Sequence, residues 1–388
     1  MPDKSHSKLL FLIHSWLTLP IWFFVLFVCV TGTLAVVSEE IVWLTQPEAR
    51  ATKPSSTAVP MGYDQMIQKM KQSAPGLIVQ SIRPHNESHF ATTMQVSYSD
   101  GRLAEVYVNP YTGVIQGESP AFNFKKFTRA LHGWLLIPFS KGYSWGWYAV
   151  SFLGVLLMGS VITGVVVYKR FWRGFFKAPR QDHGARVFWG DFHRLAGLWS
   201  SGFIALMAIT ATWFLVQAVL SDNHIEFPSQ PASTLMTDQD IPMMAGGSYP
   251  DLLSPDQAIH IVSKSIPGFQ PSYINLPRHA YDYLEVVGQG QVPFIYQSAS
   301  INPYSGATAT SSLMSNRSAL EAVVKTMRPL HTGDFGGLWI KLIWCFFGIL
   351  VSLMVLSGLL IWSKRTAKAT ASLLNRISRH PTAIGETP

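Results

Sequence analysis

Residues 14–31 read HSWLTLPIWFFVLFVCVT, and residues 193–210 read HRLAGLWSSGFIALMAIT. The two stretches align without a gap, and each places a histidine in front of a long apolar run that ends in threonine. Apolar runs of about 20 residues are typical of helices that span a membrane. An ionisable residue at such a run is costly, so it marks a candidate functional site.

A second pair of histidines precedes two further apolar segments. The stretch Arg129-Ala-Leu-His132 matches Arg328-Pro-Leu-His331. The chain of 388 residues is 48% hydrophobic and 13% charged, which is too apolar for a soluble protein of this size. The apolar runs predict four transmembrane helices. They lie at about residues 9–37, 144–168, 195–220 and 338–362.

Basic residues flank these segments on one side of the predicted membrane. Residues 1–8, 169–194 and 364–388 together hold 14 of the 30 Lys and Arg residues but 4 of the 22 acidic residues. Cytoplasmic loops carry such an excess, so both chain ends and the 169–194 loop are predicted to be cytoplasmic. The net charge of +8 therefore reflects membrane topology, and nucleic-acid binding is not expected.

The first apolar segment has a second interpretation as a secretory signal peptide, because Lys4 and Lys8 precede it. Its apolar stretch exceeds the ~7–15 residues usual in such peptides, and the repeat requires His14, so we expect a retained helix. The two cysteines, Cys29 and Cys345, lie inside predicted helices, so no disulfides are expected in the outer domains. The chain has no C-x-x-C-H motif, which excludes covalent haem attachment.

The sequence consists of two repeats of one unit. The turn Asn109-Pro-Tyr-Thr-Gly113 recurs as Asn302-Pro-Tyr-Ser-Gly306, and the helix end from Gly164 to Arg170 recurs from Gly358 to Arg365. Each half holds two membrane helices, an even number, so both halves insert the same way up as parallel repeats. The predicted fold is an α-helical integral membrane protein whose two repeats each carry an inserted α+β outer domain.

Each outer domain has the same predicted order of a helix followed by strands. A helix begins near Tyr63 in the first domain and after Ser254, a good N-cap, in the second. The Asn-Pro-Tyr-Thr/Ser-Gly motif is read as a turn that closes each sheet. His85 and His89 fall in a polar turn of the first domain, where we expect them to be solvated. Strands are predicted at Leu77–Ile82, Ala91–Tyr98, Leu103–Val108, Ser272–Leu276, Tyr281–Val287 and Pro293–Ile301.

The predicted boundaries follow from these signals. In chain order we expect a cytoplasmic N-terminus (1–8), a first membrane helix (9–37), a first outer domain (38–130), a second membrane helix with its outer lead-in (131–168), a cytoplasmic loop (169–194), a third helix (195–220), a second outer domain (221–330), a fourth helix with its lead-in (331–362) and a cytoplasmic tail (363–388).

Parallel repeats place the four histidines in two pairs. His14 and His193 lie at the same inner depth, and His132 and His331 lie at the same outer depth, so a twofold axis can bring each pair face to face. Facing imidazoles suit the two axial positions of a haem iron, and bis-histidine b-type haem transfers electrons. The pattern predicts two haems, one near each face of the membrane.

Three arginines accompany the histidines. Arg129 and Arg328 each precede a histidine by three residues, which places them side by side on a helix. Arg194 follows His193 directly. These side chains are candidates to pair with haem propionates, although arginines at such positions also serve as interfacial anchors.

These residues together resemble the PepSY-associated transmembrane family. The motifs are Leu-His-Gly at 131–133, Phe-His-Arg at 192–194, Leu-His-Thr-Gly at 330–333 and the two Asn-Pro-Tyr turns. Within the family the chain is similar to the inner-membrane ferrisiderophore reductases of the FoxB type. The resemblance implies an enzyme of the bacterial inner membrane that carries two b-type haems. Its substrate would be Fe(III) in a siderophore or another ferric chelate, reduced on the periplasmic side.

Two other classes of function stay open at this stage. The PepSY name also refers to peptidase-inhibitory domains, so the outer domains could form a non-redox sensor or regulatory module anchored in the membrane. Parallel repeats also occur in transporters. The chain has no G-x-G-x-x-G or Walker A motif, so electrons are expected from a cytoplasmic reductase or from a quinol in the membrane lipid.

Overall fold

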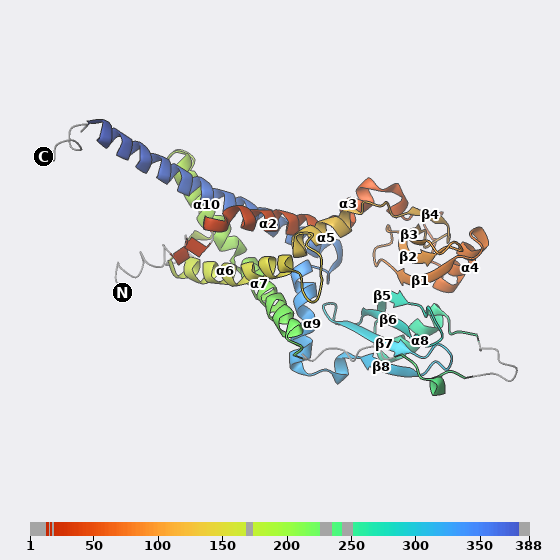
Figure 1. Cartoon of the computed structure of the whole chain (residues 1–388). Helices are drawn as coiled ribbons and strands as arrows, with labels where there is room; N and C mark the ends of the chain where they lie inside the picture. The colour runs from red at the N-terminus through yellow and green to blue at the C-terminus, as the bar shows by residue number, and fades with distance from the viewer. Residues whose placement is uncertain are drawn as a thin grey trace. The chain divides into compact units, whose positions relative to one another are not determined.

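The computed structural model describes residues 13, 14, 16, 17, 19–167, 174–225, 235–242 and 251–379 (Figure 1). The predicted cytoplasmic N-terminus, the basic residues Lys169 and Arg170 and the end of the tail lie outside the described residues. The chain divides into two compact units. The first unit comprises Met1–Ala35, Thr128–Asp222 and Leu342–Pro388, and the second comprises Val36–Phe127 and Asn223–Lys341.

The first unit is built from long apolar helices. Among the described residues, three helices are long and apolar enough to cross a membrane: α6 (Trp145–Val167), α7 (Ala185–Asp222) and α10 (Gly337–Arg379). A fourth candidate arises when α2 (Trp22–Val36) and α3 (Ser38–Thr45), which form a bent pair, are counted as one span. The part of the chain that the structure describes therefore holds three such helices, or up to four.

The predicted first helix is interrupted near its start. Ile13, His14, Trp16 and Leu17 are helical, but Leu19–Ile21 form a 3-10 turn (η1) before α2 begins. The cause is Pro20, which has no backbone N–H to donate and whose ring clashes with the preceding turn of an α-helix. The residues around His14 therefore form a separate helical segment ahead of α2.

Three of the four histidines lie inside helices rather than at the start of a span. Helix α7 begins at Ala185, so His193 is preceded by two helical turns. His132 and His331 lie near the ends of two separate amphipathic helices, α5 (Phe124–Trp134) and α9 (Ala319–Thr332). Each histidine does precede an apolar run in the sequence. However, His132 and His331 do not lie on the apolar helices α6 and α10 but on the shorter helices α5 and α9, which precede them.

The second unit holds one antiparallel sheet of eight strands. Its order is β4-β3-β2-β1-β5-β6-β7-β8, so the strands of the two sequence halves meet at β1 and β5. The bounds of its helices and strands are α4 (Tyr63–Ser73), β1 (Ile78–Arg83), β2 (Thr92–Ser97), β3 (Leu103–Val108), β4 (Ile115–Glu118), α8 (Pro255–Ser265), β5 (Gln270–Asn275), β6 (Leu284–Gln289), β7 (Tyr296–Ile301) and β8 (Thr308–Ser312).

The junction between β1 and β5 joins the two predicted outer domains. Ser81 pairs with Asn275 and Ile82 with Ile274, and the Leu276 N–H donates to the Gln80 carbonyl at 2.9 Å. Each half would otherwise present an open strand edge, which is prone to pairing with another chain. The two domains expected from the sequence thus share one sheet.

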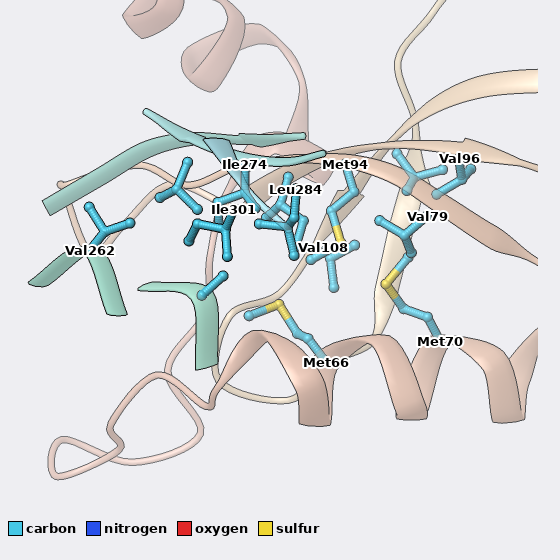
Figure 2. Packing of buried hydrophobic residues seen from close by; sticks show 14 of the residues in the cluster. Met66, Met70, Val79, Met94, Val96, Val108, Val262, Ile274, Leu284 and Ile301 are labelled. Carbon is cyan, nitrogen blue, oxygen red and sulfur yellow. The ribbon is translucent and has the colours of Figure 1, made fainter. Parts of the chain in front are cut away.

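A hydrophobic core that both halves share lies between this sheet and helices α4 and α8. Figure 2 shows Met66 and Met70 of α4 against side chains from strands of both halves, among them Met94, Ile274 and Leu284. These side chains are almost completely buried. Since burying a large apolar side chain contributes about 1.5–3 kcal/mol, the shared core ties the two halves into one folding unit.

Each of these two helices is capped by an aspartate of the other. The Asp256 carboxylate accepts hydrogen bonds from the backbone N–H groups of Tyr63 (3.0 Å) and Asp64 (2.9 Å) at the start of α4. Asp64 in turn accepts from the Ser254 hydroxyl at 2.6 Å. The N-cap of α4 is Gly62, which has no side chain to do this itself. The first N–H groups of a helix need such partners, so α4 depends on the second half of the chain.

We expect Asp256→Ala to lower the free energy of unfolding of the second unit by about 1–2 kcal/mol, the usual cost of losing a cap. Hydrogen exchange of the α4 peptides in the full-length protein would measure it. Asp100→Ala is the control, because Asp100 caps only the exposed turn at Arg102. Equal protection of α4 in both variants would contradict the capping role.

Each half has one more strand than the sequence predicted. The three strands expected in each half are present, with ends shifted by a few residues. The Asn-Pro-Tyr-Thr/Ser-Gly turn does not close the sheet, because β4 and β8 follow it as edge strands. These strands read IQGE and TATSS, and such short polar sequences lack the apolar alternation that identifies a strand.

Candidate functional site

The structure brings His14 and His193 together in the first unit. The centroids of the two imidazole rings lie 6.5 Å apart, and the ring planes are inclined by 80°. The two residues are 179 positions apart in the sequence, and each comes from one of the two aligned stretches. The proximity expected for the inner pair is thus present.

This separation suits two axial ligands of one metal ion. Imidazoles bound through Nε2 on opposite sides of a metal have ring centroids roughly 6–6.5 Å apart, given a metal–nitrogen bond of about 2.0–2.1 Å. Aromatic rings in direct contact pack with centroids about 4.5–7 Å apart, so 6.5 Å lies at the loose end of ordinary packing.

Hydrogen bonds set the tautomer of both rings. Nδ1 of His14 lies 3.1 Å from the Ser160 carbonyl oxygen, and Nδ1 of His193 lies 3.0 Å from the Met354 carbonyl oxygen. A carbonyl can only accept, so each Nδ1 must carry the proton and donate it. Each Nε2 then has an available lone pair. Metal-bound histidines usually donate their other ring N–H to such an oxygen.

A side-chain hydroxyl also lies within hydrogen-bond distance of each Nδ1. The Thr163 Oγ1 lies 3.2 Å from Nδ1 of His14, and the Ser357 Oγ lies 3.0 Å from Nδ1 of His193. In both cases the hydroxyl residue stands one turn after the carbonyl residue on the supporting helix, α6 or α10. Both rings are therefore held by the same arrangement of a carbonyl and a hydroxyl.

A glycine follows each hydroxyl residue and lets the ring approach the helix. A Cβ atom at Gly164 would lie 3.4 Å from Cε1 of His14, and one at Gly358 would lie 3.3 Å from Cε1 of His193. A methyl group would be an ordinary contact at Gly164 and a tight one at Gly358, so these positions leave little room for a side chain beside the ring. The recurrence of Gly164 as Gly358 in the sequence was a signal for this support, although sequence reasoning did not connect it with the histidines.

His132 has the same kind of support. Its Nδ1 lies 3.1 Å from the Val28 carbonyl oxygen and 3.5 Å from Thr31 Oγ1, both on α2. A Cβ atom at Gly32 would lie only 2.7 Å from Cε1 of His132. Thr31 ends the first of the two aligned stretches, and Gly32 follows it directly. The stretch that begins with His14 therefore also supports the imidazole of His132.

The two histidines of the predicted outer pair belong to different units. His132 belongs to the first unit, and His331 belongs to the second, where it lies in the last turn of α9. Helix α9 ends at Gly333, whose φ of +73° is the left-handed conformation that suits glycine after a helix. The pairing of His132 with His331 stays a prediction.

Comparison with known proteins identifies the family. The sequence profile of the PepSY-associated TM region matches residues 11–365, which include all four histidines. The chain belongs to this family. It is also similar to the uncharacterized protein PA4219 of Pseudomonas aeruginosa, at 25% identity over 253 residues. The match covers 59% of this chain and 63% of that relative, so it spans less than two thirds of the relative's length.

The three arginines of this PepSY-associated chain differ in their surroundings. Arg129 lies on α5 with His132, and Arg328 lies on α9 with His331, so both have the helical spacing expected from the sequence. Arg194 is half exposed, and its guanidinium pairs with Asp191, which also binds Arg180 at 2.8 Å. Pairing of any of them with a propionate stays a prediction.

The described residues hold no group of three or more His, Cys, Asp or Glu side chains that could bind a metal ion. A haem iron is held in its plane by the porphyrin and needs at most two protein ligands. The site formed by His14 and His193 is a pair of imidazoles. Two ligands suit a haem iron better than a bare metal ion, because the porphyrin supplies the remaining ligands.

His85 in the second unit is less solvated than its polar neighbourhood suggested. Its ring stacks on Phe90, with centroids 4.7 Å apart and planes inclined by 16°. Burial lowers the pKa of His85 from 6.5 to about 4, and the lysines nearby act in the same direction against the opposing effect of Glu39. His85 is therefore neutral in the folded protein near neutral pH.

We expect the second unit to lose stability as the pH falls from about 6.5 to about 4. Over this range His85 is protonated in the unfolded chain but not in the folded protein. The free energy of unfolding therefore falls by up to roughly 3 kcal/mol. Hydrogen exchange of the β1 and β2 peptides at pH 7.5 and 5.0 would measure it. His85→Asn should flatten the dependence, whereas His89→Asn, at an exposed neighbour, should not. An unchanged pH dependence in His85→Asn would contradict the assignment.

Proposed function

We propose that the chain is a di-haem b reductase of the bacterial inner membrane, which moves electrons across the bilayer to Fe(III) in a siderophore chelate. In this proposal four helices cross the membrane as two parallel repeats, with both termini in the cytoplasm and the eight-stranded sheet in the periplasm. The pair of imidazoles from His14 and His193 is the observation that carries the proposal.

The four histidines would hold two haems, with one pair of histidines for each. His14 and His193 would hold one haem, and His132 and His331 would hold the other. When bound, bis-histidine haem supplies one-electron transfer and has no open position at the iron. The three arginines Arg129, Arg328 and Arg194 would face the propionates.

The chain's own residues prepare the inner ligands for this task. The carbonyls of Ser160 and Met354 keep the proton on Nδ1, which leaves Nε2 as the donor atom. The Thr163 and Ser357 hydroxyls hold the ring orientation. Removing such second contacts usually weakens metal binding by about 10–100-fold, so these residues belong to the proposed site.

The substrate class follows from the resemblance to ferrisiderophore reductases. Hydroxamate-type siderophores bind Fe(III) through oxygen atoms and hold Fe(II) far less tightly, so transfer of one electron would release the iron. Electrons would reach the inner site from a cytoplasmic reductase or from a quinol, since no nucleotide-binding motif occurs in the sequence.

A reduced-minus-oxidised absorbance spectrum of the purified protein, together with a haem-to-protein ratio, tests the proposal. We expect a b-type spectrum and a ratio of about two, one haem for each histidine pair. The reduced protein should then transfer electrons to a ferric hydroxamate chelate, and a coloured Fe(II) chelator would detect the product. Protein without a reducible haem spectrum would refute the proposal and favour a sensor or transporter.

A further inference from the structure

Four charged side chains gather in the second unit with little exposure to solvent. They come from α3, the start of α5 and the start of α10, which are far apart in the sequence. The exposed fractions of the side chains are 8% for Lys341, 18% for Glu40, 20% for Lys125 and 26% for Glu39.

Glu39 is the centre of this cluster. Its Oε2 accepts a hydrogen bond from Lys341 Nζ at 2.9 Å, and its Oε1 accepts one from Lys125 Nζ. Lys341 also donates to Glu40 Oε1 at 2.9 Å. One carboxylate therefore holds two lysines, with one oxygen for each.

The two lysines lie on the two segments that lead to the outer histidines. Lys125 lies on α5, seven residues before His132, and about two helical turns place them on the same side of the helix. Lys341 lies near the start of α10, ten residues after His331. Glu39 thus anchors both segments to the same point of α3.

The repeat alone does not require this arrangement. When the alignment of the two stretches is continued without a gap, Glu39 and Glu40 correspond to Ala218 and Val219 in the second half. An ion-pair cluster that served only to fold one repeat would be expected in both repeats, but only the first repeat has these two glutamates. Removing Glu39 would leave a poorly solvated lysine without its partner, which is costly.

We infer that Glu39 is a positioning residue for the two segments that carry the proposed outer ligands, α5 with His132 and the chain from His331 to α10. The inference rests on the proposed function, which assigns these histidines to one haem. Glu39 acts through Lys125 and Lys341 and does not itself contact the cofactor. Without the charge of Glu39, the cluster of Glu40, Lys125 and Lys341 would carry a net positive charge, which would favour the reduced form of a haem held by these histidines.

The test compares Glu39→Gln with Glu105→Gln in the full-length protein, with the bound haem as the probe. Glu105 pairs with Lys126, the neighbour of Lys125, but the Lys126 side chain is 63% exposed, so this variant is a matched control. We expect Glu39→Gln to shift the electron paramagnetic resonance signal of one low-spin ferric haem and to raise its midpoint potential. The other haem and the control variant should match the unchanged protein.

A second variant separates positioning from misfolding. The double change Glu39→Gln with Lys125→Gln removes the ion pairs of Glu39 with Lys125 and with Lys341, and it keeps the pair between Lys341 and Glu40. No charge of the cluster is then left without a partner. It should fold and show the same shift in one haem. Two unaltered haem signals in both variants would overturn the inference. If the unchanged protein bound no haem, the proposed function itself would fail, which is a distinct result.

Discussion

Replacing His193 with alanine is expected to remove one of the two proposed haems and to leave the other in place. The haem-to-protein ratio should fall from about two to about one, because each haem of the proposal would depend on two histidines. His14→Ala should give the same spectrum as His193→Ala, since the two ring centroids lie 6.5 Å apart and both residues are assigned to one haem. Absorbance and electron paramagnetic resonance spectra of the purified variants would measure it.

The control for these variants is His224→Ala. His224 lies just beyond the end of the same helix α7, and it is exposed. This change should keep both haems, which separates loss of a ligand from a general effect of removing a histidine. Retention of two unaltered haems in His193→Ala would show that the inner pair is an ordinary aromatic contact and would refute the inner site.

His132→Ala is expected to remove the other haem and to stop electron transfer to the chelate. The inner haem should still be reduced from the cytoplasmic side, because its ligands and their supports on α6 and α10 are untouched. Reduction of a ferric chelate added on the periplasmic side should fall to the rate measured without protein. His331→Ala should behave in the same way, since both histidines are assigned to one iron.

Reconstitution of the variants in vesicles makes this second prediction measurable from both sides. A reductant inside the vesicle reports on the inner haem, and a ferric chelate outside reports on the complete path. Chelate reduction at the rate of the unchanged protein in His132→Ala would show that electrons leave by another route. Loss of both haems in this variant would show that the two sites do not form independently.

The sequence alone predicted the inner pair because the two aligned stretches carry their histidines at the same place. It did not predict what supports the rings. Thr163 and Ser357 lie on other helices, α6 and α10. Only the fold shows that Thr163 contacts His14 and that Ser357 contacts His193. The separation of His132 and His331 from the spans was also hidden, because an amphipathic helix that precedes an apolar run has no strong signal at their boundary.

The outer part of the chain shows a similar limit. Six strands could be predicted from apolar alternation, which is a local signal, but β4 and β8 are too short and polar to show it. The pairing of β1 with β5 depends on the meeting of segments nearly 200 residues apart, and no local pattern encodes such a contact. The same holds for Glu39, whose two lysine partners lie 86 and 302 positions away.

The exchanged caps of α4 and α8 have a consequence for how such a chain could arise. Asp64 and Asp256 stand at equivalent places in the two halves, and each reaches the helix start of the other. A half-length ancestor with one such aspartate and one open strand edge could have completed both contacts with a second copy of itself. Gene fusion would then have made a symmetric dimer permanent, and only afterwards could one side acquire a charge cluster that the other lacks.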